Sequence, residues 1–313
     1  MKIPIFLFNG LLEAGKTSFM NYMLKKPVFA DGKNTLVIIC EEGIEEYDTS
    51  YCGANHITLV TVEDEEALTE AYMNELAEKY NPQRVLIEYN GMWDMAVPFN
   101  MNYPKAWFIY EVITLVNGET YGVYLNNMRG IMMEHFKCAD LVIFNRVGEE
   151  DHTSSYRNTV KAVNGQAQLF ICNEEFALEP IKEELPYDIH ADVIEVEDKD
   201  YGIWYIDLWE EPQRYMNKCV KVNGLFFHDD DEPKDCFTFG RFAMPCCADD
   251  ISLMGLYCHN IGKLKFNNQD SISVLAEIHY EKAEVYNNDK GPVLYVKSIE
   301  KAEKNQEDLV TFN

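Results

Sequence analysis

The sequence predicts an α/β domain with a mainly parallel sheet, followed by a small β-barrel domain. Over residues 1–175, short apolar runs alternate with segments of helical spacing. From residue 218 onward the runs are short and β-rich, and turn residues separate them. The content of 47% hydrophobic and 26% charged residues is that of a folded, soluble protein. These observations favour two domains of different class within the 313 residues.

The first domain is expected to contain seven buried strands. Segments with helical spacing lie between the apolar runs, notably 64–80 and 120–138. Buried strands that alternate with amphipathic helices predict a parallel sheet covered on both faces. The expected strands are residues 3–8, 35–40, 57–62, 84–89, 107–116, 140–145 and 167–172.

Residues 176–217 are interpreted as a connecting segment packed on the first domain. They contain three prolines, many acidic residues and the aromatic group from Tyr201 to Trp209. Residues 218–302 contain five β-rich runs at hairpin-to-loop spacing, which predicts the barrel. The polar residues 303–313 are expected to form a frayed tail.

Charge and composition exclude several classes of protein. A formal charge of −26 disfavours binding to nucleic acid, because phosphates would be repelled over most of the surface. No apolar run approaches the ~20 residues of a membrane span, so an integral membrane protein is not expected. The apolar segment that begins at Ile3 lacks a cleavage site and is interpreted as a strand. Nine cysteines, an odd number, favour reduced thiols and a cytoplasmic location.

The strongest motif is a phosphate-binding loop. Residues 10–17, GLLEAGKT, match GxxxxGK[ST] and lie between an expected strand and an expected helix. In such a loop, backbone N–H groups surround the phosphates, Lys16 reaches the β/γ-phosphates and the Thr17 hydroxyl ligates Mg²⁺. The predicted nucleotide-binding residues of the loop are Gly10, Leu11, Leu12, Glu13, Ala14, Gly15, Lys16, Thr17 and Ser18.

A second motif is the acidic end of the strand at 84–89. Glu88 occupies the position at which a P-loop protein places the carboxylate that holds Mg²⁺ through water. Gly91 follows three residues later and could bring its backbone N–H to the γ-phosphate. We therefore expect Lys16, Thr17 and Glu88 to form the catalytic group.

The order of these motifs resembles the CobW/HypB/UreG family of metal-handling GTPases. That family carries ExxG where other GTPases carry DxxG, and Glu88–Gly91 matches the replacement. The resemblance covers residues 1–175 and implies GTP and Mg²⁺ as ligands. It also implies a switch glutamate near the metal at Glu41 or Glu42. The segments that carry the resemblance are NGLLEAGKT, IICEEGIEEYD, LIEYNGMWD, VITLVNG and CADLVIFNRV.

The sequence departs from the family pattern at two places. The guanine-reading motif NKxD is replaced by residues 145–148, NRVG, so its Asp is absent and Glu149 is the nearest substitute acceptor. Asn145 and Glu149 are therefore the predicted base-reading residues. The family's CxCC metal motif is also missing, because only Cys52 lies in that segment. We expect the first domain to lack that metal site.

The C-terminal domain contains an adjacent cysteine pair. Its segment FTFGRFAMPCCADD resembles a bacterial family associated with permeases, in which GR…CCxxD recurs in a small barrel of the oligonucleotide/oligosaccharide-binding type. That resemblance implies a fold and no activity. Cys246, Cys247, Cys258 and His259 are candidate soft ligands for Zn²⁺ or Cu⁺. The alternatives are cysteines that pack as small apolar residues and cysteines with redox chemistry.

Two functions remain open from the sequence. The first is a GTPase that drives delivery or assembly of a metal or metallocofactor on a client protein. Its turnover is expected to be slow, because no arginine finger is evident in the sequence. The second is a nucleotide-gated regulator or adaptor of a membrane permease, with little turnover. The absent CxCC motif favours the second, and a metal-binding Cys246-Cys247 pair would favour the first.

Overall fold

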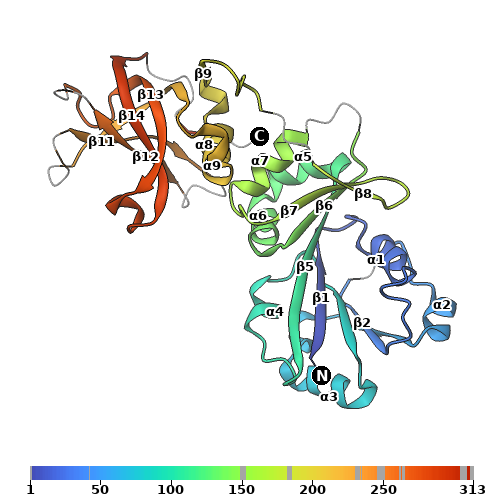
Figure 1. Cartoon of the computed structure of the whole chain (residues 1–313). Helices are drawn as coiled ribbons and strands as arrows, with labels where there is room; N and C mark the ends of the chain where they lie inside the picture. Colours follow the sequence, from blue (N-terminus) through green and yellow to red (C-terminus); the bar gives the residue numbers. More distant parts are fainter. Residues whose placement is uncertain are drawn as a thin grey trace. The chain divides into compact units, whose positions relative to one another are not determined.

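The computed structural model describes residues 2–41, 43–148, 153–181, 185–229, 233, 235–244, 251–260, 262, 265–303 and 309–310. The chain forms two compact units (Figure 1). The first contains Met1–Thr153 and Gln166–Ile181, and the second contains Ser154–Gly165 and Lys182–Asn313.

An eight-stranded sheet forms the centre of the first unit, in the order β3-β2-β4-β1-β5-β6-β7-β8 (Figure 1). All neighbouring strands are parallel except β8, which is antiparallel to β7. The predicted parallel α/β sheet is thus confirmed. Its strands are β1 (Ile3–Asn9), β2 (Thr35–Ile39), β3 (Ile57–Thr61), β4 (Arg84–Glu88), β5 (Trp107–Asn117), β6 (Leu141–Asn145), β7 (Gln168–Cys172) and β8 (Leu178–Pro180).

Helices cover both faces of this sheet. On one face, Leu7 and Ile87 of the sheet pack with Met73 of α3. On the other face, Phe8 and Leu86 pack with residues of α1. Consecutive strand residues thus contact opposite layers, as expected for strands buried on both sides. The helices are α1 (Lys16–Leu24), α2 (Thr49–Ala54), α3 (Glu70–Tyr80), α4 (Ala96–Asn100), α5 (Gly118–Asn127) and α6 (Arg129–Cys138), with a 3₁₀ helix at Glu65–Ala67.

Two expected helices are shorter than their sequence pattern. The first begins only at Glu70, because the Thr69 side chain accepts a hydrogen bond from the Tyr72 N–H and caps α3 there. The segment 120–138 is divided into α5 and α6 at Met128, whose backbone leaves the helical region with φ −134° and ψ 30°. Local capping and backbone conformation set these boundaries, which hydrophobic spacing alone does not encode.

Polar residues collect at the carboxyl ends of the parallel strands. β1 ends at Asn9, β4 at Glu88 and β6 at Asn145, and Glu41 follows β2 by two residues. The carboxyl ends of parallel strands meet at one edge of the sheet, which is where ligands bind in α/β proteins. The phosphate-binding loop follows β1 at the same edge.

The second unit is built on a six-stranded sheet in the order β11-β12-β14-β13-β10-β9. β10 pairs with β13 and also with β11, so the pairings lead from β10 through β11, β12, β14 and β13 back to β10. The predicted β-rich domain is confirmed, while a barrel of the oligonucleotide/oligosaccharide-binding type stays a prediction. The strands are β9 (Val193–Glu195), β10 (Cys219–Phe227), β11 (Cys236–Ala243), β12 (Ser252–Asn260), β13 (Ser271–Lys282) and β14 (Lys290–Lys301).

Helices of the second unit pack on its strands. Tyr201, Trp204 and Tyr215 are fully buried in one apolar cluster with side chains of β10 to β14. The prediction that 176–217 packs on the first domain is corrected for residues 201–215, because the aromatic side chains there lie in the core of the second unit, while β8 pairs with β7 of the first unit. The helices are α7 (Thr153–Lys161), α8 (Tyr201–Glu210) and α9 (Pro212–Tyr215), with 3₁₀ helices at Asp198–Asp200 and Glu284–Tyr286.

A buried carboxylate joins the helices of this unit. Asp207 on α8 is fully buried and accepts hydrogen bonds from Arg214 at 2.8 Å and from the Tyr215 hydroxyl at 2.6 Å. Arg157 on α7 lies 3.8 Å from Asp207 and 3.0 Å from Glu210. These contacts explain why α7 belongs with the second unit although it lies between β6 and β7 in sequence.

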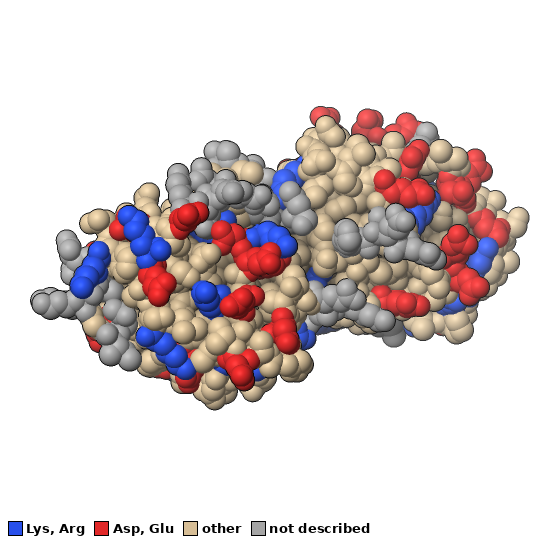
Figure 2. Space-filling model, turned by 90° about the horizontal axis from the view of Figure 1, so that it is seen from above, with Lys and Arg blue, Asp and Glu red and all other residues tan. Residues whose placement is uncertain are grey.

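None of the helices in the described part of the chain has the length and apolar character of a membrane span. On the face shown in Figure 2, Asp and Glu side chains are spread over the surface with Lys and Arg interspersed among them.

Candidate functional site

The phosphate-binding loop runs from the end of β1 into α1. Gly15 adopts φ +85°, a left-handed conformation that favours glycine, and starts the helix without a side-chain cap. The first turn of α1 contains no acidic residue. Its backbone N–H groups and the positive end of the helix dipole are therefore suited to an anion such as a phosphate.

Lys16 is held by the loop and by an acidic partner. Its ammonium donates to the carbonyls of Gly10 at 2.6 Å and Leu11 at 3.2 Å. It also forms an ion pair with Glu41 at 2.6 Å, and the two side chains are 2% and 10% exposed. The ammonium is thus directed into the site and is neutralised there by a carboxylate from the segment after β2.

Thr17 and Glu88 form the second contact of the site. The Thr17 hydroxyl donates to Oε1 of Glu88 at 2.6 Å and keeps its lone pairs for a cation. Mg²⁺ prefers hard oxygen ligands of this kind, held through one or two carboxylates with water and phosphate completing the shell. The residues present therefore fit Mg²⁺, with Thr17 as ligand and Glu88 and Glu41 as nearby carboxylates.

Glu88 is almost fully buried at the end of β4. Burial raises the pKa of its carboxyl group, and hydrogen bonds from Thr17 and Tyr47 with the charge of Lys16 oppose that shift. The Tyr47 hydroxyl donates to Oε2 of Glu88 at 2.5 Å. Both oxygens of the carboxylate consequently have a hydroxyl partner, which fixes its orientation.

Gly91 packs directly on the phosphate-binding loop. A Cβ atom at Gly91 would lie 2.1 Å from the Gly10 carbonyl oxygen and 2.8 Å from the Leu11 Cα. No side chain fits in that space without moving the loop. The glycine of the ExxG motif is therefore required by close backbone contact, and its backbone lies beside the phosphate-binding loop.

A cavity of about 900 Å³ opens beside the loop on the β6 and β7 side. Asn145 lines it and donates from Nδ2 to the Ala14 carbonyl at 2.7 Å, while its Oδ1 is buried without a hydrogen-bond partner among the described residues. Arg146 reaches the Glu13 carbonyl at 3.0 Å. Glu149, the predicted substitute acceptor, lies outside the described residues. The lining residues are Gly15, Ser18, Glu119, Asn145, Arg146, Val147, Gly148, Ile171, Cys172, Asn173, Glu174 and Phe176.

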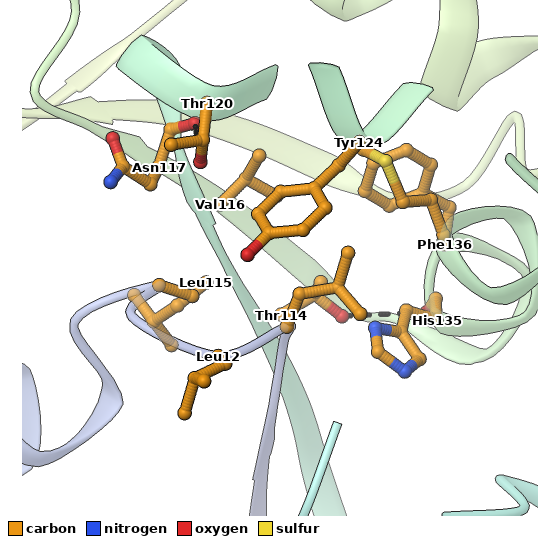
Figure 3. Close-up of a pocket in the computed structure, with 12 residues that line it drawn as sticks. Leu12, Thr114, Leu115, Val116, Asn117, Thr120, Tyr124, His135 and Phe136 are labelled. Carbon is orange, nitrogen blue, oxygen red and sulfur yellow. Dashed lines mark hydrogen bonds between the residues drawn. The ribbon is translucent and has the colours of Figure 1, made fainter. Parts of the chain in front are cut away.

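A second, much smaller cavity lies behind the loop (Figure 3). Its volume of about 20 Å³ has room for roughly one water molecule. His135 of α6 lines it beside Thr114, and its Nε2 is buried without a partner among the described residues. Burial lowers the pKa of His135 to about 4, with the charge of Lys16 as a smaller cause, while a hydrogen bond with the Gly91 backbone opposes the shift.

Sequence reasoning missed Tyr47 and His135. Tyr47 lies in the segment IEEYD, where the only available signal was a lone aromatic residue among acidic ones. His135 has the spacing of an ordinary helix residue, and nothing in the sequence indicates that α6 packs behind the phosphate-binding loop. The hydrogen bond from Tyr47 to Glu88 and the position of His135 beside the loop each bring together elements that lie far apart in sequence.

The predicted soft ligands of the second unit are not gathered in the described structure. Cys258 is fully buried in the core, and its neighbour His259 lies on the opposite face of β12, with Nδ1 3.2 Å from Sγ of Cys236. Cys246 and Cys247 lie outside the described residues. Within the part of the chain that the structure describes, no three His, Cys, Asp or Glu side chains are grouped as metal ligands.

Comparison with protein families gives two matches. A family described as CobW/HypB/UreG, nucleotide-binding domain, matches residues 4–171, and one described as DUF1980 C-terminal domain matches residues 171–310. No curated protein matches the chain.

Similar solved structures include two kinds of protein. Hydrogenase maturation factor HypB from Archaeoglobus fulgidus is 13% identical with a TM-score of 0.39, over 55% of this chain and 81% of that one. Zn(II)-bound YjiA GTPase from E. coli is 13% identical with a TM-score of 0.41, over 88% and 93% of the two chains. A Zn(II)-bound triple mutant of YjiA GTPase is 14% identical with a TM-score of 0.44, over 77% and 86%.

Proposed function

The chain belongs to the CobW/HypB/UreG family, and we propose that it binds and hydrolyses GTP with Mg²⁺ and couples this reaction to delivery of a metal or metallocofactor to a partner protein. The observation that carries the proposal is the grouping of three side chains at one loop. Lys16 is directed into the loop, and Thr17 lies 2.6 Å from Glu88. Phosphoryl transfer depends mainly on such positioning and on neutralisation of charge.

Each member of the group has a separate role in this proposal. The Lys16 ammonium would neutralise charge on the transferring phosphoryl group. Thr17 and Glu88 would hold Mg²⁺, which supplies Lewis acidity at the phosphate oxygens when bound. Gly91, whose backbone lies on the loop, would bring its N–H toward the γ-phosphate. Asn145 would contact the base from the wall of the large cavity.

Phosphate release by the purified full-length chain tests the proposal. With GTP and Mg²⁺ we expect slow turnover, and Lys16→Ala should lower kcat/KM by about 100-fold, the size of effect seen when a charge-stabilising donor is removed. Lys26→Ala is the matched control, because Lys26 contacts the Tyr22 ring just beyond the C-terminal end of the same helix. Equal rates in wild type and Lys16→Ala would refute the assignment.

A nucleotide-gated regulator of a permease is the second candidate function. It is favoured by the C-terminal domain match at 171–310 and by the permease-associated family that this segment resembles. The two functions differ in turnover. Tight nucleotide binding without measurable phosphate release, whether or not metal ions are added, would favour the regulator.

We also propose a soft-metal site in the second unit that uses Cys246 and Cys247, with His259 as a third candidate ligand. Zinc and copper ions are bound by thiolate and imidazole groups of this kind. Support comes from the chemistry of these side chains, and the ligand would be the cargo in the metal-delivery proposal. The zinc content of the purified protein after anaerobic zinc loading tests it.

A further inference from the structure

Tyr47 links the segment after β2 to the carboxylate of Glu88. It precedes Asp48, whose side chain caps α2 by accepting from the Tyr51 N–H. The Tyr47 side chain is 9% exposed and packs in the apolar cluster that contains Met20 and Cys52. Its hydroxyl is 2.5 Å from Oε2 of Glu88 and 3.3 Å from the Met20 sulfur. An apolar environment around a hydroxyl–carboxylate hydrogen bond strengthens it.

The two carboxylate oxygens of Glu88 accept hydrogen bonds from two different parts of the chain. Thr17, in the phosphate-binding loop, donates to Oε1, and Tyr47 donates to Oε2. Thr17 would keep this donation while its lone pairs face a cation. Tyr47 therefore decides the orientation of the rest of the carboxylate, and without it one oxygen of a buried Glu88 would lack a partner among the described side chains.

The same segment also contacts the phosphate-binding loop. Glu41 pairs with Lys16 at 2.6 Å, so residues 41 and 47 bracket a short stretch of chain and both contact the nucleotide site. Between them, Ile44 is 87% exposed. A change at the nucleotide phosphates or the cation would thus act on both ends of this stretch.

We propose that Tyr47 is a positioning residue that fixes Glu88 for the magnesium ion of the bound nucleotide and ties residues 43–48 to the state of the site. This inference rests on the proposed function, since it needs a bound nucleotide with Mg²⁺. Tyr47 acts through Glu88 and does not itself contact the nucleotide. If Tyr47 only filled the core, Tyr47→Phe would preserve its role, because the ring remains.

The test compares release of fluorescently labelled GDP from the full-length chain in excess Mg²⁺ and in EDTA. In Tyr47→Phe we expect release to be about 10-fold faster than wild type in Mg²⁺, the order expected for loss of a hydrogen bond to a charged group, and equal to wild type in EDTA. Tyr51→Phe is the matched control, because its hydroxyl donates at 3.2 Å to the Leu24 carbonyl, away from Glu88. It should match wild type in both conditions.

A double-mutant cycle keeps the inference testable if Tyr47→Phe is also destabilised. Glu88→Gln should reproduce the Mg²⁺-specific change, and adding Tyr47→Phe to it should have little further effect, because the two residues act as one unit. Deuterium exchange in peptides that cover residues 43–52 supplies a readout other than release. Mg²⁺ added to the GDP complex should protect these peptides in wild type and less so in Tyr47→Phe.

Two results would overturn the inference. Equal acceleration in Mg²⁺ and EDTA would show a structural role for Tyr47, and release equal to wild type in both would show no role. A wild-type chain that binds no labelled GDP would overturn the proposed function itself, which distinguishes the two failures.

Discussion

The Lys16 ammonium lies 2.6 Å from the Glu41 carboxylate, and both side chains are almost buried. The carboxylate thus neutralises the cation that we expect to meet the nucleotide phosphates. Removing one partner of a buried ion pair strongly destabilises the folded protein, because the remaining charge is left without compensation. Phosphate oxygens could provide the same compensation. Stability and nucleotide binding are therefore linked through Glu41.

Glu41→Gln should lower the free energy of unfolding of the nucleotide-free protein by about 3 kcal/mol. The loss should be smaller with saturating GDP, because phosphate replaces the missing carboxylate beside Lys16. Urea unfolding with and without GDP measures both values. Glu45→Gln is the control, since Glu45 is an exposed acid of the same segment. An equal loss with and without GDP would contradict the interpretation.

Gly91→Ala should impair the site although alanine is a small change. The added Cβ would meet the Gly10 carbonyl oxygen at 2.1 Å, so the phosphate-binding loop must move. We expect phosphate release to fall about 100-fold, as for misplacement of catalytic groups by about 1 Å. Gly122→Ala on α5 is the control, because nothing lies within 4 Å of its added Cβ. It should leave release unchanged and stabilise the protein by about 0.5–1 kcal/mol.

The strands and the phosphate-binding loop could be predicted because their signals are local. Seven apolar runs correspond to β1 to β7, and residues 10–17 carry their spacing in one continuous stretch. The sites where sequence reasoning fell short depend on contacts between distant segments. The Tyr47–Glu88 bond joins residues 41 positions apart. No periodicity or motif encodes that distance.

Packing between elements also decided the role of residues 176–217. Their aromatic group was visible in sequence, but its partners were not. Trp204 packs in the core with strands that follow it in the chain, and Arg157 of α7 reaches Asp207 across 50 residues. The hydrophobic effect is non-directional, so the composition of a segment indicates that its large side chains are buried but does not indicate in which of the two units they pack.

The stability of the protein should fall below pH 6.5 through His135. Burial lowers the pKa of this imidazole from 6.5 to about 4, so the folded state disfavours protonation and the unfolded state takes up the proton first. The stabilisation is complete above pH 6.5 and is lost as pH falls toward 4. Between pH 7.5 and 5 the loss should be about 2 kcal/mol.

Urea unfolding at pH 7.5, 6.5 and 5 measures this slope. His135→Gln should remove that part of the pH dependence, while His56→Gln, at an exposed position, should retain it. A wild-type slope preserved in His135→Gln would assign the pH dependence to other groups.

Asn145 should contribute to recognition of the base. It lines the large cavity and donates to the Ala14 carbonyl, and its Oδ1 is buried without a hydrogen-bond partner among the described residues. GTP should displace labelled GDP at lower concentrations than ATP does, by a smaller margin than an intact NKxD motif would give. Asn145→Ala should weaken GTP binding about 10-fold. Asn74→Ala removes an equivalent amide-to-carbonyl bond on α3 and should have no effect. Equal or tighter binding of ATP to wild type would move the assignment to an ATPase.

Cys258 and the Cys246-Cys247 pair should differ in what their substitution removes. Cys258 is fully buried among apolar side chains, and its Sγ lies 3.6 Å from the Leu256 carbonyl. Cys258→Ser should lower the free energy of unfolding by about 1–3 kcal/mol, because a hydroxyl would enter the core, and should leave the zinc content unchanged.

The double substitution Cys246→Ser/Cys247→Ser should lower the zinc content. Metal binding should also weaken as pH falls, because both thiols must lose protons to bind. Elemental analysis after anaerobic zinc loading, run beside urea unfolding of each variant, measures both effects. Wild-type protein without zinc after loading would end the metal proposal, and zinc loss in Cys258→Ser at unchanged stability would place the ligand in the core.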